Sequence, residues 1–179
     1  MIIHELTTDR LRLRAWTSAD LEPFAALNAD PEVMRYFPAV LTREESDAFA
    51  AAIMTRMDQR GFGLWAVETA GTRDFIGFVG LAMPMWEAHF MPCVEVGWRL
   101  ARRFWNQGYA TEAARAALAF GFDHAKLPEI VSFTSLQNTP SRRVMEKLGM
   151  TTNPADDFDH PRIAEGHPLR RHVLYRKRP

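Results

Sequence analysis

The sequence is poor in features that mark disulfide-rich, membrane-spanning or secreted proteins. Its 179 residues include a single cysteine, Cys93, which excludes an internal disulfide framework and favours a reducing compartment. No apolar run approaches the length of a membrane-spanning helix, and the N-terminal residues lack the pattern of a signal peptide. We therefore predict a cytoplasmic protein that does not bind a membrane.

The sequence also lacks an excess of charge of either sign. The 22 lysine and arginine residues balance the 22 aspartate and glutamate residues. Without a general basic field, nucleic acid is not an expected partner. The six histidines show no spacing typical of metal ligands, so no metal is predicted. The length suits one domain over residues 1–179, with a core large enough to fold alone.

Local patterns in the first third predict one strand followed by helices. Apolar residues alternate with arginines over residues 11–15, which is typical of a half-buried strand. Thr17 with Asp20 forms a potential capping box for a helix that reaches about residue 28. Residues 30–31, Asp-Pro, predict a short second helix. A further capping box at 42–45 opens a helix that reaches about residue 60.

The remainder predicts strands alternating with helices. Strands are expected at 64–68, 75–83, 93–100, 130–135 and 172–176, and the first two of these form a hairpin. Helices are expected at about 111–124 and from residue 140 or 141 to the glycine at 149. The proline-rich segment 153–168 is expected to be a loop, which could cover a site or form a dimer contact. Together these elements predict an α/β fold.

The most informative segment is the turn at residues 105–113, Trp-Asn-Gln-Gly-Tyr-Ala-Thr-Glu-Ala. It joins an apolar strand to an alanine-rich helix, and the first N–H groups of a helix lack internal partners and attract anions. Gly108 would let the backbone approach a phosphate closely, and Thr111 is predicted to cap the helix. An ordinary strand-to-helix loop is the alternative, since one glycine is weak evidence.

A second segment strengthens the phosphate interpretation. Residues 138–150, together with the turn at 105–113, resemble the cofactor-binding half of the GNAT superfamily of acetyl-CoA-dependent N-acetyltransferases. That family holds a pyrophosphate on a loop of the form Arg/Gln-x-x-Gly-x-Gly/Ala, in which Gly108 and Ala110 match and Trp105 replaces the Arg or Gln. The N-terminal segments 8–21 and 30–37 resemble the Rim-type branch, which includes ribosomal-protein N-terminal acetyltransferases.

The resemblance implies a fold and an activity. It implies a single-domain GNAT fold of the α/β (α+β) class, with a mixed, mostly antiparallel sheet, a splayed central strand pair and flanking helices. The motifs span about residues 8–150, and residues 151–179 supply a C-terminal loop and strand. The implied reaction is direct attack of a primary amine on the thioester of acetyl-CoA. The amine would belong to a peptide N-terminus or a small molecule, and the protein would be a monomer or homodimer.

The same resemblance assigns residues to the cosubstrate. Main-chain groups near the end of the central strand would pair with the pantetheine arm, the glycine turn would hold the pyrophosphate, and Lys147 would add charge. Arg103 is near enough to the turn in sequence to add charge as well. The candidate cofactor-binding residues are Trp98, Arg99, Leu100, Arg103, Gln107, Gly108, Tyr109, Ala110, Thr111, Asn138, Ser141 and Lys147. Arg103 could instead be a surface residue, and Asn138 could merely shape the turn before Pro140.

Two residues are candidates for catalysis. Glu95 lies on the central strand beside the expected thioester, where burial would raise its pKa and suit it to accept a proton. A paired structural glutamate is the alternative. Many relatives carry a tyrosine seven residues after the motif asparagine, but here that position is Met145, which cannot donate a proton. Ser141 could hydrogen-bond the departing sulfur, or it could simply cap a helix.

Aromatic residues border the expected acceptor side. Tyr36, Phe37, Trp86 and Phe90 are candidate substrate-binding residues, with core packing as the alternative for at least two of them.

An α-amine has a pKa of about 8, so it releases its proton at neutral pH more easily than a lysine amine does. This favours an α-amine acceptor. A non-catalytic acyl-CoA-binding module is the rival function, because Trp105 and Met145 depart from the family pattern.

Overall fold

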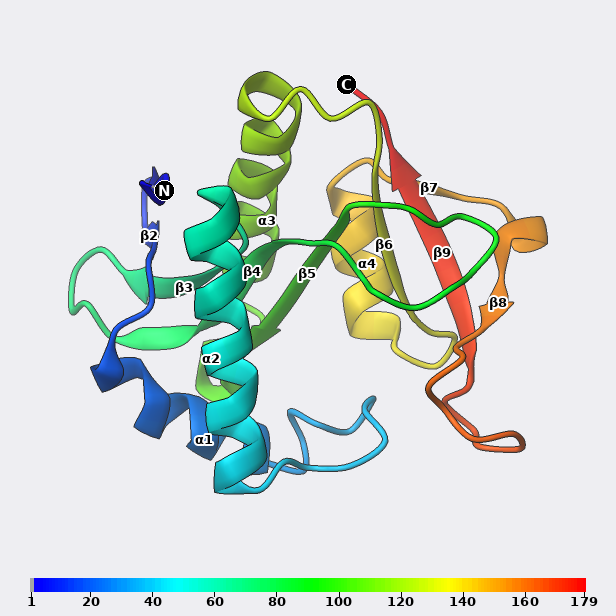
Figure 1. Cartoon of the computed structure of the whole chain (residues 1–179), viewed down its shortest axis with the longest axis horizontal. Helices are drawn as coiled ribbons and strands as arrows, with labels where there is room; N and C mark the ends of the chain where they lie inside the picture. Colours follow the sequence, from blue (N-terminus) through cyan, green and yellow to red (C-terminus); the bar gives the residue numbers. More distant parts are fainter. Residues whose placement is uncertain (1) are drawn as a thin grey trace.

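The computed structural model describes residues 2–179, which form one mixed sheet flanked by helices (Figure 1). The strands follow the order β1-β2-β3-β4-β5-β6-β9-β7, and β8 pairs with β9. Their bounds are β1 Leu6–Thr7, β2 Leu11–Arg14, β3 Leu64–Thr69, β4 Phe75–Ala82, β5 Glu95–Leu100, β6 Ile130–Ser135, β7 Thr151–Thr152, β8 Phe158–Asp159 and β9 Arg171–Lys177. The helices are α1 Leu21–Ala29, α2 Arg43–Arg60, α3 Tyr109–Ala119 and α4 Thr139–Lys147, with short turns at η1 Ser18–Asp20, η2 Arg102–Phe104, η3 Phe120–His124 and η4 Pro154–Asp156.

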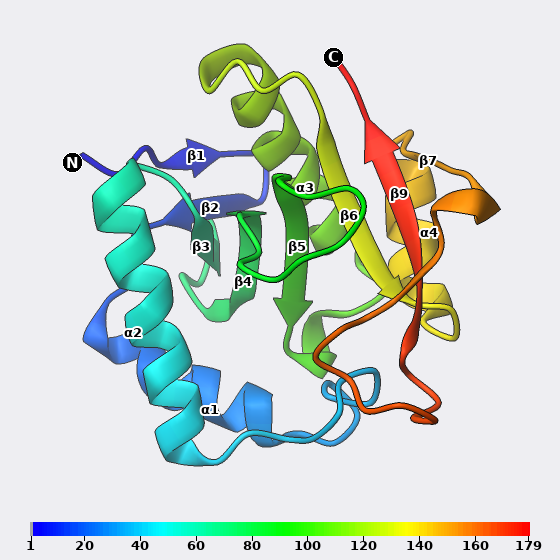
Figure 2. The ribbon, with the colours of Figure 1, turned by 45° about the vertical axis from the view of Figure 1, so that its right-hand side comes forward.

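The sheet is antiparallel except where β5 meets β6. These two strands are parallel, and their register contains one pair, Glu95 with Val131. The N–H of Val131 donates to the carbonyl of Val94 at that end. Beyond it the strands separate toward their C-terminal ends, as Figure 2 shows. The expected mixed, mostly antiparallel sheet with a splayed central pair is confirmed.

Helices cover both faces of the sheet. α1 and α2 lie in front of it in the view of Figure 1, and α3 and α4 lie behind it. The apolar side chains of β5 alternate accordingly, so that Val96 and Leu100 belong to the core together with the alanines of α3. The opposite side of β5 presents Glu95, Gly97 and Arg99 toward the layer of α1 and α2.

Local capping explains where α1 and α2 begin and end. The Thr42 hydroxyl accepts a hydrogen bond from the N–H of Glu45, whose carboxylate accepts one from the N–H of Thr42. Gly61 ends α2 with a φ of 77°, a left-handed conformation that favours glycine. The carboxylate of Asp20 likewise accepts from the N–H of Thr17, which opens η1 and then α1. Both predicted capping boxes are therefore confirmed.

Two helix predictions were wrong. Residues 31–37 form turns and not a short helix, because Met34 N–H donates to the Asp30 carbonyl but Phe37 N–H then returns to Met34 in a tighter turn. α3 begins at Tyr109 with Gly108 as its N-cap, so Thr111 lies inside the first turn and does not cap the helix. The left-handed φ of 82° at Gly108 starts the helix earlier than a threonine cap would.

Three short strands also escaped prediction. β1, β7 and β8 have two residues each, which is too short to show alternation. The segment 153–168 is therefore not entirely a loop, because it contains η4 and β8. β8 pairs with β9 through Phe158 and Asp159, which ties this segment to the end of the sheet.

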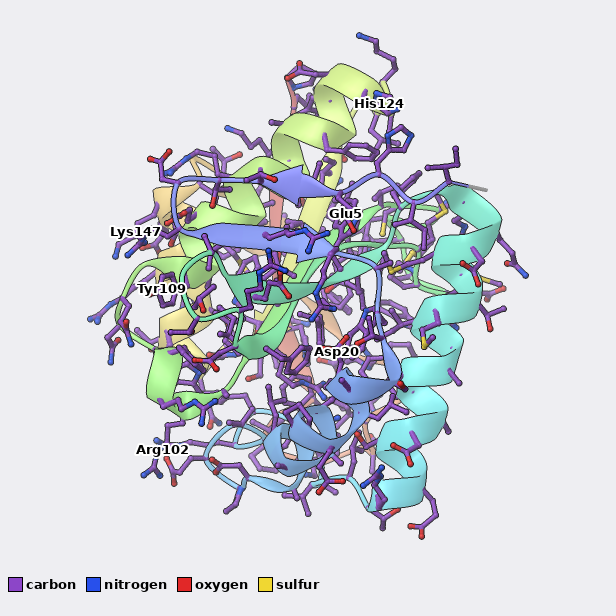
Figure 3. The ribbon with its side chains drawn as sticks, turned by 90° about the vertical axis from the view of Figure 1, so that its left-hand side faces the viewer. Glu5, Asp20, Arg102, Tyr109, His124 and Lys147 are labelled. Carbon is purple, nitrogen blue, oxygen red and sulfur yellow. The ribbon has the colours of Figure 1, made fainter. Side chains whose placement is uncertain are left out.

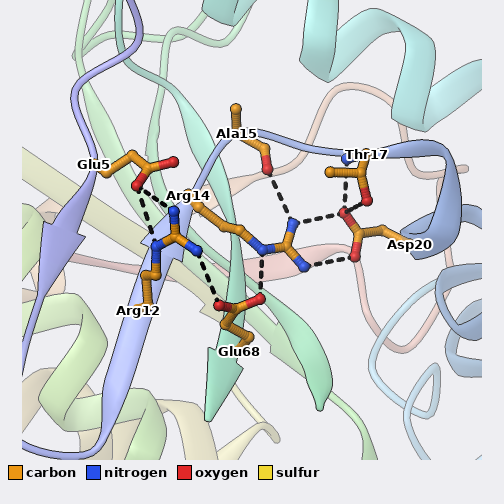
Figure 4. Close-up of polar contacts among 7 residues, drawn as sticks. All are labelled: Glu5, Arg12, Arg14, Ala15, Thr17, Asp20 and Glu68. Atoms are coloured by element: carbon orange, nitrogen blue, oxygen red, sulfur yellow. Dashed lines mark hydrogen bonds and ion pairs between the residues drawn. The ribbon is translucent and has the colours of Figure 1, made fainter. Parts of the chain in front are cut away.

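A buried ion network joins β2, β3 and η1 (Figure 4). The Arg14 guanidinium donates to both carboxylate oxygens of Asp20 at 2.7 and 2.8 Å and to Glu68 at 2.6 Å. Burial alone would raise the pKa of Asp20, but the hydrogen bonds from Arg14 and Thr17 outweigh burial and lower it. Since every charged group in the network has a partner, we interpret it as structural.

The structure bears on two further sequence predictions. Within residues 2–179, no helix is long and apolar enough to span a membrane. The same residues contain no group of three or more histidine, cysteine, aspartate or glutamate side chains that could hold a metal ion.

Candidate cosubstrate and acceptor site

The turn before α3 presents unpaired backbone donors. The first hydrogen bond inside the helix runs from the N–H of Glu112 to the carbonyl of Gly108. The N–H groups of Tyr109, Ala110 and Thr111 therefore lie before the first helical bond and remain available to a ligand. Asn106 and Gly108 both adopt left-handed φ values, 59° and 82°, which curl the chain around Gln107. Such a turn at a helix N-terminus fits a pyrophosphate.

Arg10, in the turn between β1 and β2, contacts the glycine turn directly. It donates to the Gln107 carbonyl at 3.0 Å, forms an ion pair with Glu112 at 2.6 Å, and lies over the ring of Tyr109 at 4.5 Å. Thr8 adds a hydrogen bond to the same carboxylate at 2.6 Å. Figure 3 shows this side of the molecule, with Arg102, Tyr109 and Lys147 along one margin. Sequence reasoning missed Arg10, because its partners lie about a hundred residues away.

The gap between β5 and β6 is lined by main-chain groups. Ala101 N–H donates to the Ile76 carbonyl, so the odd-numbered residues of β5 turn their main chain toward β4. Arg99 therefore cannot offer its main chain to the gap, which corrects one predicted contact. The main-chain groups of Trp98 and Leu100 do face the gap, although the Leu100 carbonyl already accepts a hydrogen bond from Trp105 Nε1 at 2.7 Å.

Trp105 and Met145, the two departures from the family pattern, have structural roles. The indole of Trp105 is 39 % exposed and closes the end of β5 through its bond to Leu100. Met145 is 1 % exposed and belongs to the core under α4, so it replaces a polar tyrosine with apolar packing. No proton donor takes its place at that position.

The start of α4 lies after β6. Asn138 caps the helix by accepting from the N–H of Ser141 at 3.2 Å, and its amide donates to Thr134 at 2.8 Å. Asn138 therefore shapes the turn, and Ser141 is not the cap. Within the described residues, the Ser141 hydroxyl has no hydrogen-bond partner, so it stays available to a ligand. Lys147 lies exposed in the last turn of α4, and Arg103 is exposed near the glycine turn.

Glu95 lies at the start of the gap between β5 and β6. It forms the one register pair with β6, is half-buried, and has no salt bridge or hydrogen bond within the described part of the chain. Burial raises its pKa to about 8, the direction expected from the sequence. Its carboxylate leans along the strand over Gly97, where an added Cβ would lie 3.8 Å from Oε1. The alternative of a paired structural glutamate therefore has no partner to support it.

Arg99 follows Gly97 on the same side of β5. Its Nη1 donates to the side-chain oxygen of Asn28 on α1 at 2.6 Å, and the amide of Asn28 donates to Ser46 on α2 at 2.8 Å. The guanidinium lies 4.1 Å from the ring centre of Phe37. Burial lowers the pKa of Arg99 to about 10. Sequence reasoning assigned Arg99 only through its main chain and missed Asn28 altogether.

The four candidate aromatic residues divide into two groups. Phe37 is 38 % exposed and Tyr36 is half-buried, both on the turn segment that reaches Arg99. Trp86 and Phe90 pack instead with Phe158 in a second apolar cluster that also includes Phe133, with ring centres 5.8 and 4.9 Å from Phe158. Core packing therefore describes Phe90, which is 8 % exposed, better than substrate binding does.

Cys93 lines a pocket of about 370 Å³ between the segment before β5 and the segment before β6, together with Phe90, Pro92, Leu127 and Glu129. Burial raises the pKa of its thiol to about 12, and Glu95 adds to the effect. The thiol is therefore protonated at neutral pH, which makes Cys93 a poor nucleophile.

Comparisons with known proteins agree with this geometry. Residues 10–151 match the family model described as "Acetyltransferase (GNAT) domain". The chain is 34 % identical over 149 residues to the uncharacterized protein YkkB of Bacillus subtilis, covering 82 % of this chain and 84 % of YkkB. An acetyltransferase (GNAT family) from Bacillus anthracis superposes with a TM-score of 0.81 at 28 % identity, covering 98 % of both chains. Ribosomal-protein-S5-alanine acetyltransferase from Vibrio fischeri shares the fold, with a TM-score of 0.75 at 15 % identity over 98 % of this chain and 96 % of that one.

Proposed function

Because this chain belongs to the GNAT acetyltransferase family, we propose that it transfers the acetyl group of acetyl-CoA to a primary amine and that Glu95 is its general base. Acetyl transfer is the family's activity. The proposal adds the class of the accepting amine and the roles of individual residues. The observation that carries the proposal is the unpaired, half-buried Glu95, with a pKa of about 8, at the point where β5 and β6 begin to separate.

The proposed site holds the cosubstrate mainly through its main chain. The N–H groups of Tyr109, Ala110 and Thr111 bind the pyrophosphate, and Arg103 or Lys147 adds positive charge. Trp98 and the N–H of Leu100 pair with the pantetheine arm in the gap. Bound acetyl-CoA supplies a thioester whose carbon–sulfur bond breaks as the carbon–nitrogen bond forms.

The remaining residues handle the proton and the acceptor. Glu95 accepts the proton that the amine gives up, directly or through water. The Ser141 hydroxyl donates to the departing sulfur, and a thiol whose pKa is about 8.5 leaves without a strong acid. This removes the need for the missing tyrosine at Met145. Since one weak base serves the site, the acceptor is an α-amine, whose pKa is about 8, and not a lysine side chain.

The acceptor class distinguishes a Rim-like enzyme from one that modifies metabolites. The N-terminal segments 8–21 and 30–37 support the Rim-like branch as a hypothesis. Thiol release from acetyl-CoA, measured with a panel of free N-terminal peptides and a panel of small amines, tests it. Release with peptides alone supports the Rim-like branch, whereas release with small amines alone favours metabolite modification. Absence of release with every amine, despite tight acetyl-CoA binding, would favour a non-catalytic acyl-CoA module.

A further inference from the structure

Arg99 carries a charge that the protein itself does not neutralise. Its pKa of about 10 keeps the guanidinium protonated at neutral pH. Within residues 2–179 it forms no ion pair, its one hydrogen bond goes to the neutral amide of Asn28, and its Nε is buried without a partner. Buried donors in native proteins are nearly always satisfied, so this exception needs an explanation.

Other arginines near the site show what a paired guanidinium looks like in this fold. Arg10 binds Glu112, and Arg14 binds both Asp20 and Glu68. Arg99 is surrounded instead by aromatic rings, with Phe37, Phe49 and Phe78 at 4.1, 5.6 and 5.5 Å. These rings attract a cation, but they accept no ordinary hydrogen bond from its Nε.

The position of Arg99 relates it to the proposed chemistry. It lies on the same side of β5 as Glu95, four residues further along the strand. Gly97 lies between them and has no side chain, and an added Cβ there would meet only the Glu95 carboxylate, at 3.8 Å. At about 3.3 Å per residue, the two Cα atoms are roughly 13 Å apart, so two long side chains can reach one small molecule.

We propose that the acceptor is a primary amine that also carries a carboxylate, and that Arg99 binds this carboxylate while the amine lies beside Glu95. The planar guanidinium has donors in a fork that matches a carboxylate, and its free Nε is one of the two that such a pair uses. The inference rests on the proposed function, because it names the substrate class of the same site. The carboxylate could belong to a free carboxyl terminus or to an acidic side chain.

Matched dipeptides test the proposal without changing the α-amine. One pair is Ala-Gly with a free carboxyl terminus against its carboxamide, and the other is Ala-Asp-amide against Ala-Asn-amide. For the wild-type protein we expect kcat/KM to be about tenfold or more higher for the carboxylate member of at least one pair, the range of a charge-assisted hydrogen bond. The pair that shows the preference identifies the source of the carboxylate.

The variant Arg99→Met keeps an unbranched apolar stem and removes the charge. We expect the preference to fall to about one, mainly through a higher KM for the carboxylate member. Arg35→Met, which removes an exposed arginine from the neighbouring turn, should keep the preference. An equal loss with both members of each pair would assign Arg99 a structural role and overturn the proposal.

The wild-type ratio decides the matter even if Arg99→Met does not fold. Acetylation of both members with equal kcat/KM refutes the carboxylate inference and leaves the acetyltransferase function standing. Absence of thiol release with every amine tested refutes the proposed function and the inference together.

Discussion

Replacement of Glu95 by glutamine removes the proposed base while it keeps the shape of the side chain. A positioned general base contributes about 10²–10⁴-fold to a rate, so Glu95→Gln should lower kcat by about 100-fold or more. The cosubstrate contacts lie on α3 and in the gap, so the Kd of acetyl-CoA should change less than about twofold. Thiol release and calorimetric titration of acetyl-CoA measure the two quantities.

The change in rate with pH can be calculated from the pKa of Glu95. With a pKa of about 8, about 9 % of Glu95 is ionised at pH 7 and about 91 % at pH 9, so the wild-type rate should rise about tenfold across this interval. An α-amine titrates in the same range, so the acceptor for this experiment should be an amine of low pKa that is already neutral at pH 6. Glu95→Gln should flatten the profile.

Stability gives an independent check on Glu95. Folding raises its pKa from an ordinary value of 4.5 to about 8, so the folded state favours the protonated acid. Its ionisation therefore costs stability progressively as the pH rises from about 4.5 to 8. Glu95→Gln should be more stable relative to wild type at pH 9 than at pH 5, measured by urea unfolding.

A flat wild-type rate profile, or a fully active Glu95→Gln, would refute the assignment of Glu95 as the base.

Three further predictions concern the turn, the ion network and the cap. Gly108→Ala should weaken acetyl-CoA binding about tenfold or more, because its Cβ would lie at a left-handed φ and 3.4 Å from Nη2 of Arg10, the residue that holds the anion-binding turn. Gly166→Ala is the control, because Gly166 has a similar φ of 77° and open space around it. Equal affinities for both variants would contradict the idea. Asp20→Asn should cost about 3 kcal/mol in unfolding free energy at pH 7, because it takes a carboxylate away from the buried Arg14. Because the pKa of Asp20 is lowered below its ordinary 3.8, the difference in unfolding free energy between Asp20→Asn and wild type should persist above about pH 4 and shrink below it. A difference that does not change with pH would count against the ion pair. Asn138→Ala should cost about 1 kcal/mol in unfolding free energy measured with urea, and an unchanged midpoint would show that the cap is dispensable.

The local elements of this fold were predictable because their causes are local. Helix caps form between residues a few positions apart, so both partners of a cap can be seen in the sequence. This holds for the capping boxes at 17–20 and 42–45 and for the glycine at 61 that ends α2. Alternation of apolar residues with arginines over 11–15 reports which face of that strand is buried, and the buried positions of β2 are Leu11 and Leu13. The threonine cap at 111 was wrong because Gly108, three residues earlier, adopts a left-handed φ that sequence pattern cannot reveal.

The sequence by itself determined the kind of site, through the turn at 105–113 and the segment 138–150, because a helix N-terminus binds anions wherever it lies. Only the tertiary structure decided which side chains serve it. The brace between Arg10 and Glu112 joins residues about a hundred positions apart, and the unpaired charge of Arg99 depends on rings from three separate elements of the chain. Burial, and with it the raised pKa of Glu95, depends on neighbours that folding brings together.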